Sequence, residues 1–108
     1  MPAVDAVIVL TTWPAEEDPS DAAAALVEER LAACVSVLPE MESVYRWQNA
    51  VERARERQLL VKTARPRLDA LLARLKALHP YEVPEAIVLP VAGGSEAYLA
   101  WLAACTRP

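Results

Sequence analysis

The chain has 108 residues, of which 55% are hydrophobic and 24% charged, and its formal net charge is −4. That length suits a single domain, residues 1–108, and the composition excludes intrinsic disorder. The acidic balance argues against a non-specific nucleic-acid binder, which needs a basic face, and no apolar run is long enough for a membrane span.

The amino-terminal stretch MPAVDAVIVLTT has no positive side chain before its apolar run and no small-residue cleavage pattern, so it does not resemble a signal peptide. A cytoplasmic location is therefore expected. The two cysteines, Cys34 and Cys105, do not suggest a disulfide framework in such a chain, and both are expected to be reduced.

The first predicted elements are a strand and a helix. Residues 5–13, DAVIVLTTW, are mostly aliphatic or β-branched, which predicts a central strand. Residues 18–33 predict an amphipathic helix, because Asp18 or Ser20 can cap it and its apolar side chains, Val27 among them, fall on one side.

A β-hairpin is predicted next. Residues 33–38 return to strand composition, and residues 43–47, SVYRW, alternate residue by residue. Asn49 then offers a residue that tolerates the left-handed conformation of a tight turn. The return arm, residues 51–63, is charged at first and apolar later. The outer half of the hairpin is therefore expected to be exposed to solvent and its inner half to be buried. The first arginines of this arm have glutamates between them, which favours a solvated strand face over an anion site.

A second helix is predicted over residues 65–79, where leucines occupy the i, i+3, i+4, i+7 and i+10 positions of one helical stripe. Pro80 has no amide hydrogen and disfavours helical geometry in the residue before it. The helix must therefore stop at His79.

The last predicted strand covers residues 85–91, and Pro90 either confines it to a sheet edge or interrupts it. Residues 96–105 predict a short helix that Ser95 caps. The element order is β-α-β-β-α-β-α, which indicates an α+β fold, a ferredoxin-like βαββαβ sandwich with an added C-terminal helix.

Right-handed crossovers place both helices of this topology on the same face of the sheet. The strands, however, are apolar on both sides, so the opposite face would be a large exposed apolar surface. Such surfaces usually mark interfaces. Neighbouring subunits are therefore expected to cover this face, with the last helix assisting.

Five segments stand in the order and spacing of a known family, and they span roughly Val7 to Trp101. They are LVEERLAACVSVLP, SVYRWQ, LLVKT, HPYEVPEAIVLPV and YLAW. Through them the chain resembles the CutA family, proteins associated with divalent-cation tolerance. The resemblance implies a ferredoxin-like fold assembled as a tight homotrimer, a long hairpin that reaches adjacent subunits, and an architecture related to the PII-type signalling proteins.

The resemblance also implies binding of copper or another divalent cation, with no settled enzymatic reaction. The chain departs from the family pattern where a metal would matter. Thr11 and Thr12 stand where some relatives place a cysteine, and Leu78 precedes His79 where some have a second histidine. A metal site built from those extra ligands cannot form here.

His79, the only histidine, is the candidate metal ligand. A copper, nickel or zinc site usually needs about three or four ligands, so Glu82, Glu85 or a neighbouring chain would have to supply the others. The alternative is a helix-terminal histidine whose protonated form favours the negative end of the helix dipole. Cys34 is a second candidate, as a soft Cu(I) ligand, although an unpaired cysteine in an apolar strand usually acts as a small hydrophobe.

Aromatic side chains gather around the segment HPYEVPE and the hairpin. They either pack at the sheet edge and between subunits, or line a cleft between subunits that holds a small ligand or cation. The candidate cleft residues are Tyr45, Trp47, His79, Tyr81, Glu82 and Glu85.

Catalytic motifs are missing from the sequence. The stretch AGGSEAY is not a nucleophile elbow, and there is no Walker loop, dinucleotide fingerprint or HExxH motif, so neither an enzyme nor an organic cofactor is expected. Two functions stay open. One is a trimeric CutA-like protein of divalent-cation (copper) tolerance with weak or inter-subunit metal binding. The other is a PII-like signalling module that binds a small molecule or protein partner in its inter-subunit clefts.

Overall fold

The structure, a computed structural model, describes residues 4–108. The elements in chain order are β1 (Ala6–Pro14), α1 (Ser20–Glu28), β2 (Cys34–Trp47), β3 (Ala50–Ala64), α2 (Leu68–Leu78), β4 (Ile87–Pro90) and α3 (Glu96–Cys105). All strand pairs are antiparallel, and the sheet order is β2-β3-β1-β4. The predicted α+β order is confirmed, with β1 inside the sheet and β4 at its edge.

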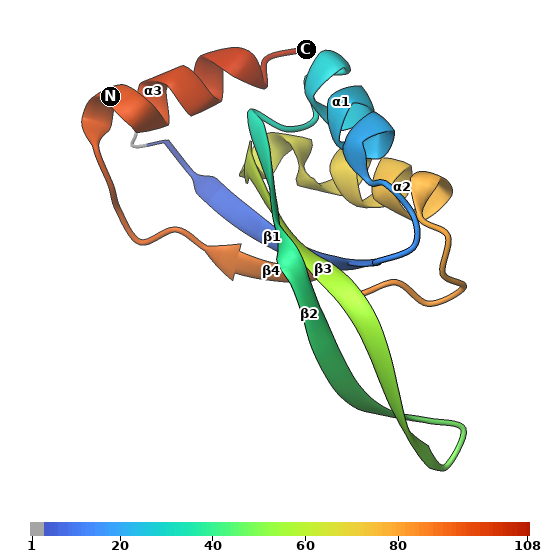
Figure 1. Cartoon of the computed structure of the whole chain (residues 1–108). Helices are drawn as coiled ribbons and strands as arrows, with labels where there is room; N and C mark the ends of the chain where they lie inside the picture. The colour runs from blue at the N-terminus through green and yellow to red at the C-terminus, as the bar shows by residue number, and fades with distance from the viewer. Residues whose placement is uncertain (1–3) are drawn as a thin grey trace.

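Helices α1 and α2 cover the same face of the sheet, as predicted (Figure 1). The core between helices and sheet is aliphatic, and its central side chains are at most 1% exposed: Leu26, Leu71, Leu75, Val9 and Val61. Burying one such side chain stabilises the fold by about 1.5–3 kcal/mol, so this layer supplies much of the driving force for folding.

Helix α1 differs from its prediction in length and in orientation. It ends at Glu28 rather than at residue 33, and Arg30 beyond it adopts a left-handed φ of 60°. Its buried side chain is Leu26, whereas Val27 is 41% exposed. The reason is the run of four alanines in this helix, which gives either side nearly the same hydrophobicity. The predicted cap is also wrong, because Pro19 occupies the N-cap position and no side chain caps the helix. The Asp18 Oδ1 accepts the amide hydrogen of Ser20 at 2.9 Å in the turn just before it.

The hairpin of β2 and β3 projects from the body of the molecule (Figure 1). The two strand segments predicted before the turn form one strand, and its register shifts between Val37 and Glu40. Pro39 lies inside this irregularity, which suits a residue without an amide hydrogen. Gln48 and Asn49 form the two-residue turn with positive φ angles of 49° and 65°. The predicted tight turn is confirmed, and both central residues are left-handed.

Helix α2 also confirms its predicted end. A short 3₁₀ turn, Arg65–Arg67, leads into it, and His79 follows it with an extended ψ of 137°. The connection from His79 to β4 then returns beside the base of the projecting hairpin (Figure 1). No helix within residues 4–108 has the length and apolar character that a bilayer crossing requires.

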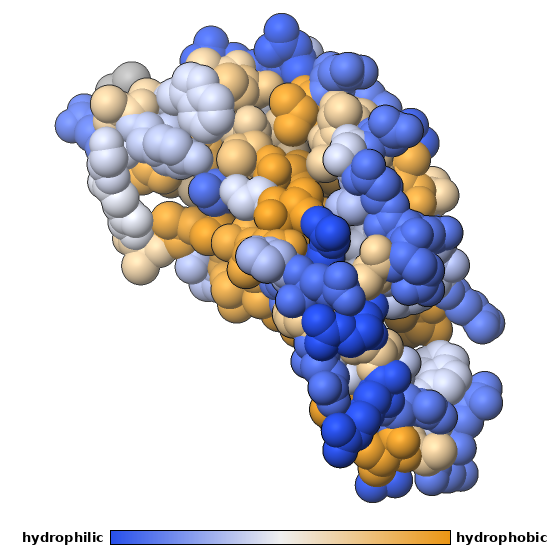
Figure 2. Space-filling model, viewed as in Figure 1, coloured by the Kyte–Doolittle hydropathy of each residue, from blue (hydrophilic) through white to orange (hydrophobic). Residues whose placement is uncertain are grey.

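The face of the sheet opposite α1 and α2 is only partly covered. Helix α3 packs at one end of it, where Leu102 contacts Ala6 and Ala64. The strand register places Ile87 beside Leu10 and Leu89 beside Ile8 on the remainder. Ile87 is 50% exposed and Leu89 42% exposed. Figure 2 shows the resulting apolar band between α3 and the polar hairpin.

Candidate functional site

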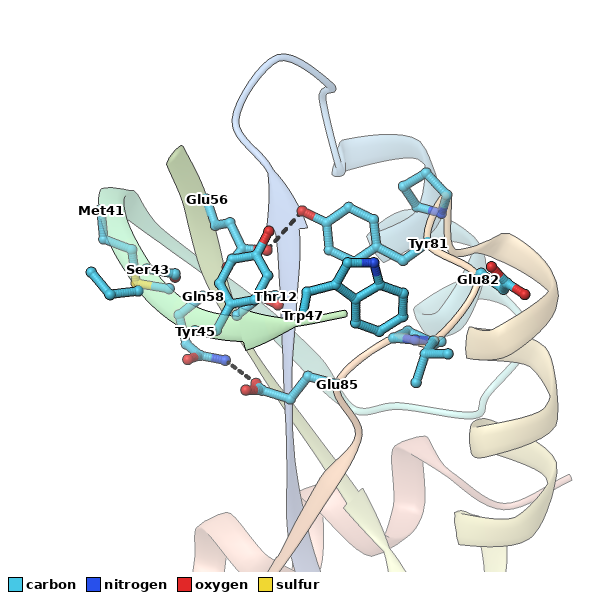
Figure 3. Close-up of a pocket in the computed structure, with 14 residues that line it drawn as sticks. Thr12, Met41, Ser43, Tyr45, Trp47, Glu56, Gln58, Tyr81, Glu82 and Glu85 are labelled. Carbon is cyan, nitrogen blue, oxygen red and sulfur yellow. Dashed lines mark hydrogen bonds between the residues drawn. The ribbon is translucent and has the colours of Figure 1, made fainter. Parts of the chain in front are cut away.

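A cavity of about 830 Å³ lies between the hairpin and the segment that joins α2 to β4 (Figure 3). From β2 it is lined by Met41, Ser43, Tyr45 and Trp47, which are alternate residues of one strand and therefore share a face. The segment from Pro80 to Glu85 forms the other wall. The volume falls within the range of about 300–1,000 Å³ that is usual for small-molecule sites.

Glu56 places a carboxylate in this cavity from β3. Its side chain is 6% exposed, and its Oε2 accepts a hydrogen bond from the Tyr81 hydroxyl at 2.7 Å. Burial, together with this hydrogen bond and the negative charge of Glu56, raises the pKa of Tyr81 well above its ordinary value. The phenol therefore stays protonated and donates to Glu56, while the pair as a whole keeps a negative charge.

Glu85 and Glu82 add two further carboxylates to the lining. The Gln58 side-chain amide donates to Glu85 at 3.0 Å and to the carbonyl oxygen of Thr11 at 2.7 Å, so Glu85 is tied to the sheet by a neutral partner. Glu82 lies at the other end, beside α2 (Figure 3). The lining contains neither lysine nor arginine. The cavity is thus acidic and aromatic.

His79 lies behind this lining rather than in it. It is 8% exposed and packs between the tilted rings of Trp13 and Tyr81, at centroid distances of 4.2 and 4.9 Å. Nδ1 accepts the amide hydrogen of Tyr81 at 3.0 Å, so Nε2 carries the ring proton and donates it to the Thr12 carbonyl at 2.6 Å. Both ring nitrogens therefore have partners within the chain.

Burial lowers the pKa of His79 below its ordinary value. The hydrogen bond to Thr12 and the charges of Glu56 and Glu17 act in the opposite direction without reversing the shift. His79 does follow the carboxyl end of α2, as the helix-terminal alternative expects. The ring is buried between aromatic side chains, where the neutral form is favoured over a charge facing the helix end.

Cys34 begins β2 on the face of the sheet away from the main core, half-buried, with its Sγ 3.7 Å from the Ser36 Oγ. It does not line the cavity. Cys105 packs in the small cluster under α3, and both thiols are unpaired. Within the described part of the chain, no three His, Cys, Asp or Glu side chains come together in a way that could hold a metal ion.

The five other candidate cleft residues, Tyr45, Trp47, Tyr81, Glu82 and Glu85, all line the cavity. Sequence reasoning missed Glu56, Gln58 and Met41, because the charged return arm was interpreted as a solvated face. The signal that could have found them is the residue pairing across the hairpin turn, which shows the residues of β3 that share a face with Tyr45 and Trp47. Glu56 pairs with Met41, and Glu52 with Tyr45, so these side chains stand on the cavity face of the hairpin.

The arginines stand on the other face of the hairpin. Arg53 forms an ion pair with Glu42 at 3.1 Å, and Arg55 one with Glu40 at 3.0 Å. All four side chains are well exposed, so each pair contributes little to stability. Their main consequence is positional. The arginines lie on the outer face, where Glu42 and Glu40 neutralise them, whereas Glu56 lies on the cavity face without an ion pair in residues 4–108.

The fold and its cavity define a class, an α+β βαββαβ protein with a C-terminal helix and an acidic, aromatic cleft. Comparison with known proteins identifies the family within this class. A model of the CutA1 divalent ion tolerance protein family matches residues 7–105. The chain therefore belongs to the CutA family of divalent-cation tolerance proteins.

Relatives and solved structures agree. The chain is 53% identical over 95 residues to the divalent-cation tolerance protein CutA of Thermus thermophilus, covering 88% of this chain and 92% of the relative. It is 45% identical to the Pectobacterium atrosepticum protein of the same name, covering 98% and 96%. Solved structures of the Thermus and rice proteins superpose with TM-scores of 0.90 and 0.91, at 50% and 43% identity. The matches cover 94% and 97% of this chain and 99% and 96% of theirs.

Proposed function

We propose that this protein acts in divalent-cation tolerance as a homotrimer that binds a divalent cation, copper among them, weakly at sites completed between subunits. Membership of the CutA family is the observation that carries this proposal. The acidic cavity is consistent with it, because Glu56, Glu82 and Glu85 attract cations.

A single chain does not fit a copper site. His79 uses both ring nitrogens within the chain, and Cys34 lies away from the cavity. Residues 4–108 also bring no three metal-ligating side chains together. Copper and zinc sites usually need three or four ligands, so a neighbouring subunit has to supply the remainder.

The trimeric state is supported by the partly covered face of the sheet. Ile87 and Leu89 are exposed there beside Ile8 and Leu10, and contiguous apolar surface of this kind marks an interface. The strands β2 and β4 also leave two sheet edges with unpaired backbone groups, which natural proteins usually pair or cover.

Isothermal titration with Cu(II) and with Zn(II) tests the metal role. We expect weak binding that Glu85→Gln reduces and that His79→Gln leaves unchanged, because the imidazole nitrogens are already occupied. A large loss on His79→Gln would mean that the ring turns outward to bind metal. Absence of any binding, in protein shown to be trimeric, would contradict the metal role.

The second candidate function is a PII-like module that binds a small molecule or a protein partner. The cavity favours it, because a volume of about 830 Å³ with half-exposed aromatic rings exceeds what a metal ion needs. A thermal-shift screen tests this second function, since a ligand that binds the folded state raises the melting temperature.

We further propose a cytoplasmic location. Relatives differ in this respect, as the rice and Arabidopsis proteins are named chloroplastic and an Archaeoglobus structure is titled periplasmic.

A further inference from the structure

We propose that the cavity binds an organic cation, an alkylammonium or guanidinium group, held by the rings of Tyr45, Trp47 and Tyr81 with Glu56 as its counter-charge. The inference rests on the second candidate function and gives its ligand a chemical class. The same group could belong to a free small molecule or to a lysine or arginine of a neighbouring copy of this chain, and the experiment below separates these sources.

Uncompensated negative charge is the first argument. Three glutamates line the cavity without a basic residue, and none of them takes part in the ion pairs found in residues 4–108. The partners of Glu56 and Glu85 are a phenol and a side-chain amide, which orient a carboxylate without neutralising it. Glu56 is also nearly buried, where a charge is screened less than at the surface. The cavity therefore repels anions and favours a cation.

The aromatic lining is the second argument. Tyr45 is 44% exposed and Trp47 45% exposed, although both stand on the strand face that turns toward the cavity. Figure 3 shows these two rings and the ring of Tyr81 around the same space, with Glu56 at its side. Aromatic faces attract organic cations, each contact contributing about 0.5–2 kcal/mol, and cages of several rings recognise quaternary ammonium groups.

Spacing distinguishes an organic cation from a metal ion. A divalent metal needs several ligands at about 2.0–2.6 Å from one point. The carboxylates are held apart here, Glu56 by Tyr81, Glu85 by Gln58, and Glu82 beside α2 (Figure 3). A cation several ångströms wide can contact rings and carboxylate at once, so it matches this arrangement better than a bare ion does.

The two faces of the hairpin also differ in charge, because only the outer face carries arginines. Its outer face carries Arg53 and Arg55 paired with Glu42 and Glu40, while its cavity face carries the aromatic rings and Glu56. Arg53, Arg55 and Arg57 are alternate residues of β3, so all three lie on the outer face. The absence of arginine from the cavity lining leaves the cation position to a ligand.

Titration calorimetry and tryptophan fluorescence with choline and agmatine test the proposal, with dimethylbutanol, the uncharged carbon isostere of choline, as the matched ligand. We expect millimolar or tighter binding of a cation and at least tenfold weaker binding of dimethylbutanol. Glu56→Gln and Trp47→Ala should each weaken cation binding at least tenfold, whereas Glu28→Gln, an exposed carboxylate of α1, should not. Because Trp47 is half-exposed, its variant stays informative if Glu56→Gln does not fold.

Sedimentation of the same variants identifies the source of the cation. If a neighbouring copy supplies it, wild type takes up no choline, and Glu56→Gln weakens the assembly while Glu28→Gln does not. Equal binding of choline and dimethylbutanol overturns the proposal. So does the absence of cation binding together with unchanged sedimentation of Glu56→Gln. Titrations with Cu(II) and Zn(II) on the same samples report on the metal role separately, so either idea can fail alone.

Discussion

His79 is a base that its surroundings keep neutral, which makes the stability of the protein depend on pH. Burial is the main cause of the lowered pKa, against opposing contributions from Thr12, Glu56 and Glu17. The unfolded chain therefore binds a proton at a higher pH than the folded chain does. The stabilising contribution is complete above the ordinary pKa of 6.5, and it is lost as pH falls from there through the folded pKa.

Nuclear magnetic resonance measures this directly, because the only imidazole signals in the spectrum belong to His79. We expect these signals to titrate below pH 6.5, and the melting temperature of wild type to decrease over the same interval. His79→Gln keeps a donor and an acceptor but does not titrate, so its melting temperature should vary less between pH 7.5 and about 5, above most carboxylate pKa values. An imidazole pKa above 6.5 would contradict this assignment.

Tyr81 supports a buried charge through a single hydrogen bond. Tyr81→Phe removes the donor at 2.7 Å from Glu56 and leaves that carboxylate nearly buried without it. We expect the free energy of unfolding, measured with urea, to decrease by about 1–3 kcal/mol. Tyr45→Phe is the control, because its ring is half-exposed and its hydroxyl makes no hydrogen bond to any residue between 4 and 108. Equal effects of the two substitutions would show that Glu56 does not depend on the phenol.

The hairpin turn is an element with a residue that suits it poorly. Two-residue turns with positive φ at both positions favour Asn-Gly, whereas this turn has Gln48 and Asn49. We expect the double substitution Gln48→Asn and Asn49→Gly to raise the free energy of unfolding by up to about 1 kcal/mol, because it relieves left-handed strain at both positions. Asn49→Val, which brings a β-branched residue to positive φ, should lower it, and a gain from that substitution would contradict the turn geometry.

Most elements of this fold could be predicted from local physics. Pro80 ends α2, the leucine stripe locates its buried side, and Pro90 indicates an edge strand, since each signal acts within a few residues. The orientation of α1 could not be predicted, because its four alanines do not distinguish one side from another.

The candidate site could be predicted from the sequence only in part. Tyr81, Glu82 and Glu85 share one short segment, so their proximity is local. Glu56 reaches Tyr81 only through the hairpin register and the path of the chain after α2, which are tertiary features. The tautomer and the burial of His79 likewise depend on Trp13 and Thr12, far away in the chain.

At the scale of the whole molecule, helices cover one face of the sheet and leave most of the other face exposed. Helices α1 and α2 complete the core on the first face, whereas α3 covers only one end of the second (Figure 1). An assembly that covered the second face would also bring neighbouring groups toward the cavity, because Gln58 and Leu60 are alternate residues of β3 on that same face. If the proposed assembly and the proposed ligand site both exist, the geometry of this one strand would couple them.

Leu89→Asp tests whether this second face of the sheet is the interface between subunits. Native mass spectrometry or sedimentation of wild type should give about 35 kDa, three times the 11.8 kDa of one chain. Leu89 is already 42% exposed in the single chain, so the substitution costs the isolated fold little. Inside an interface it would bury an unpaired charge, which is strongly unfavourable. We therefore expect the variant to shift toward 11.8 kDa. Val27→Asp, equally exposed on α1 at the opposite face, should keep the wild-type mass. A monomeric wild type, or a Leu89→Asp variant of unchanged mass, would show that this face is not the interface.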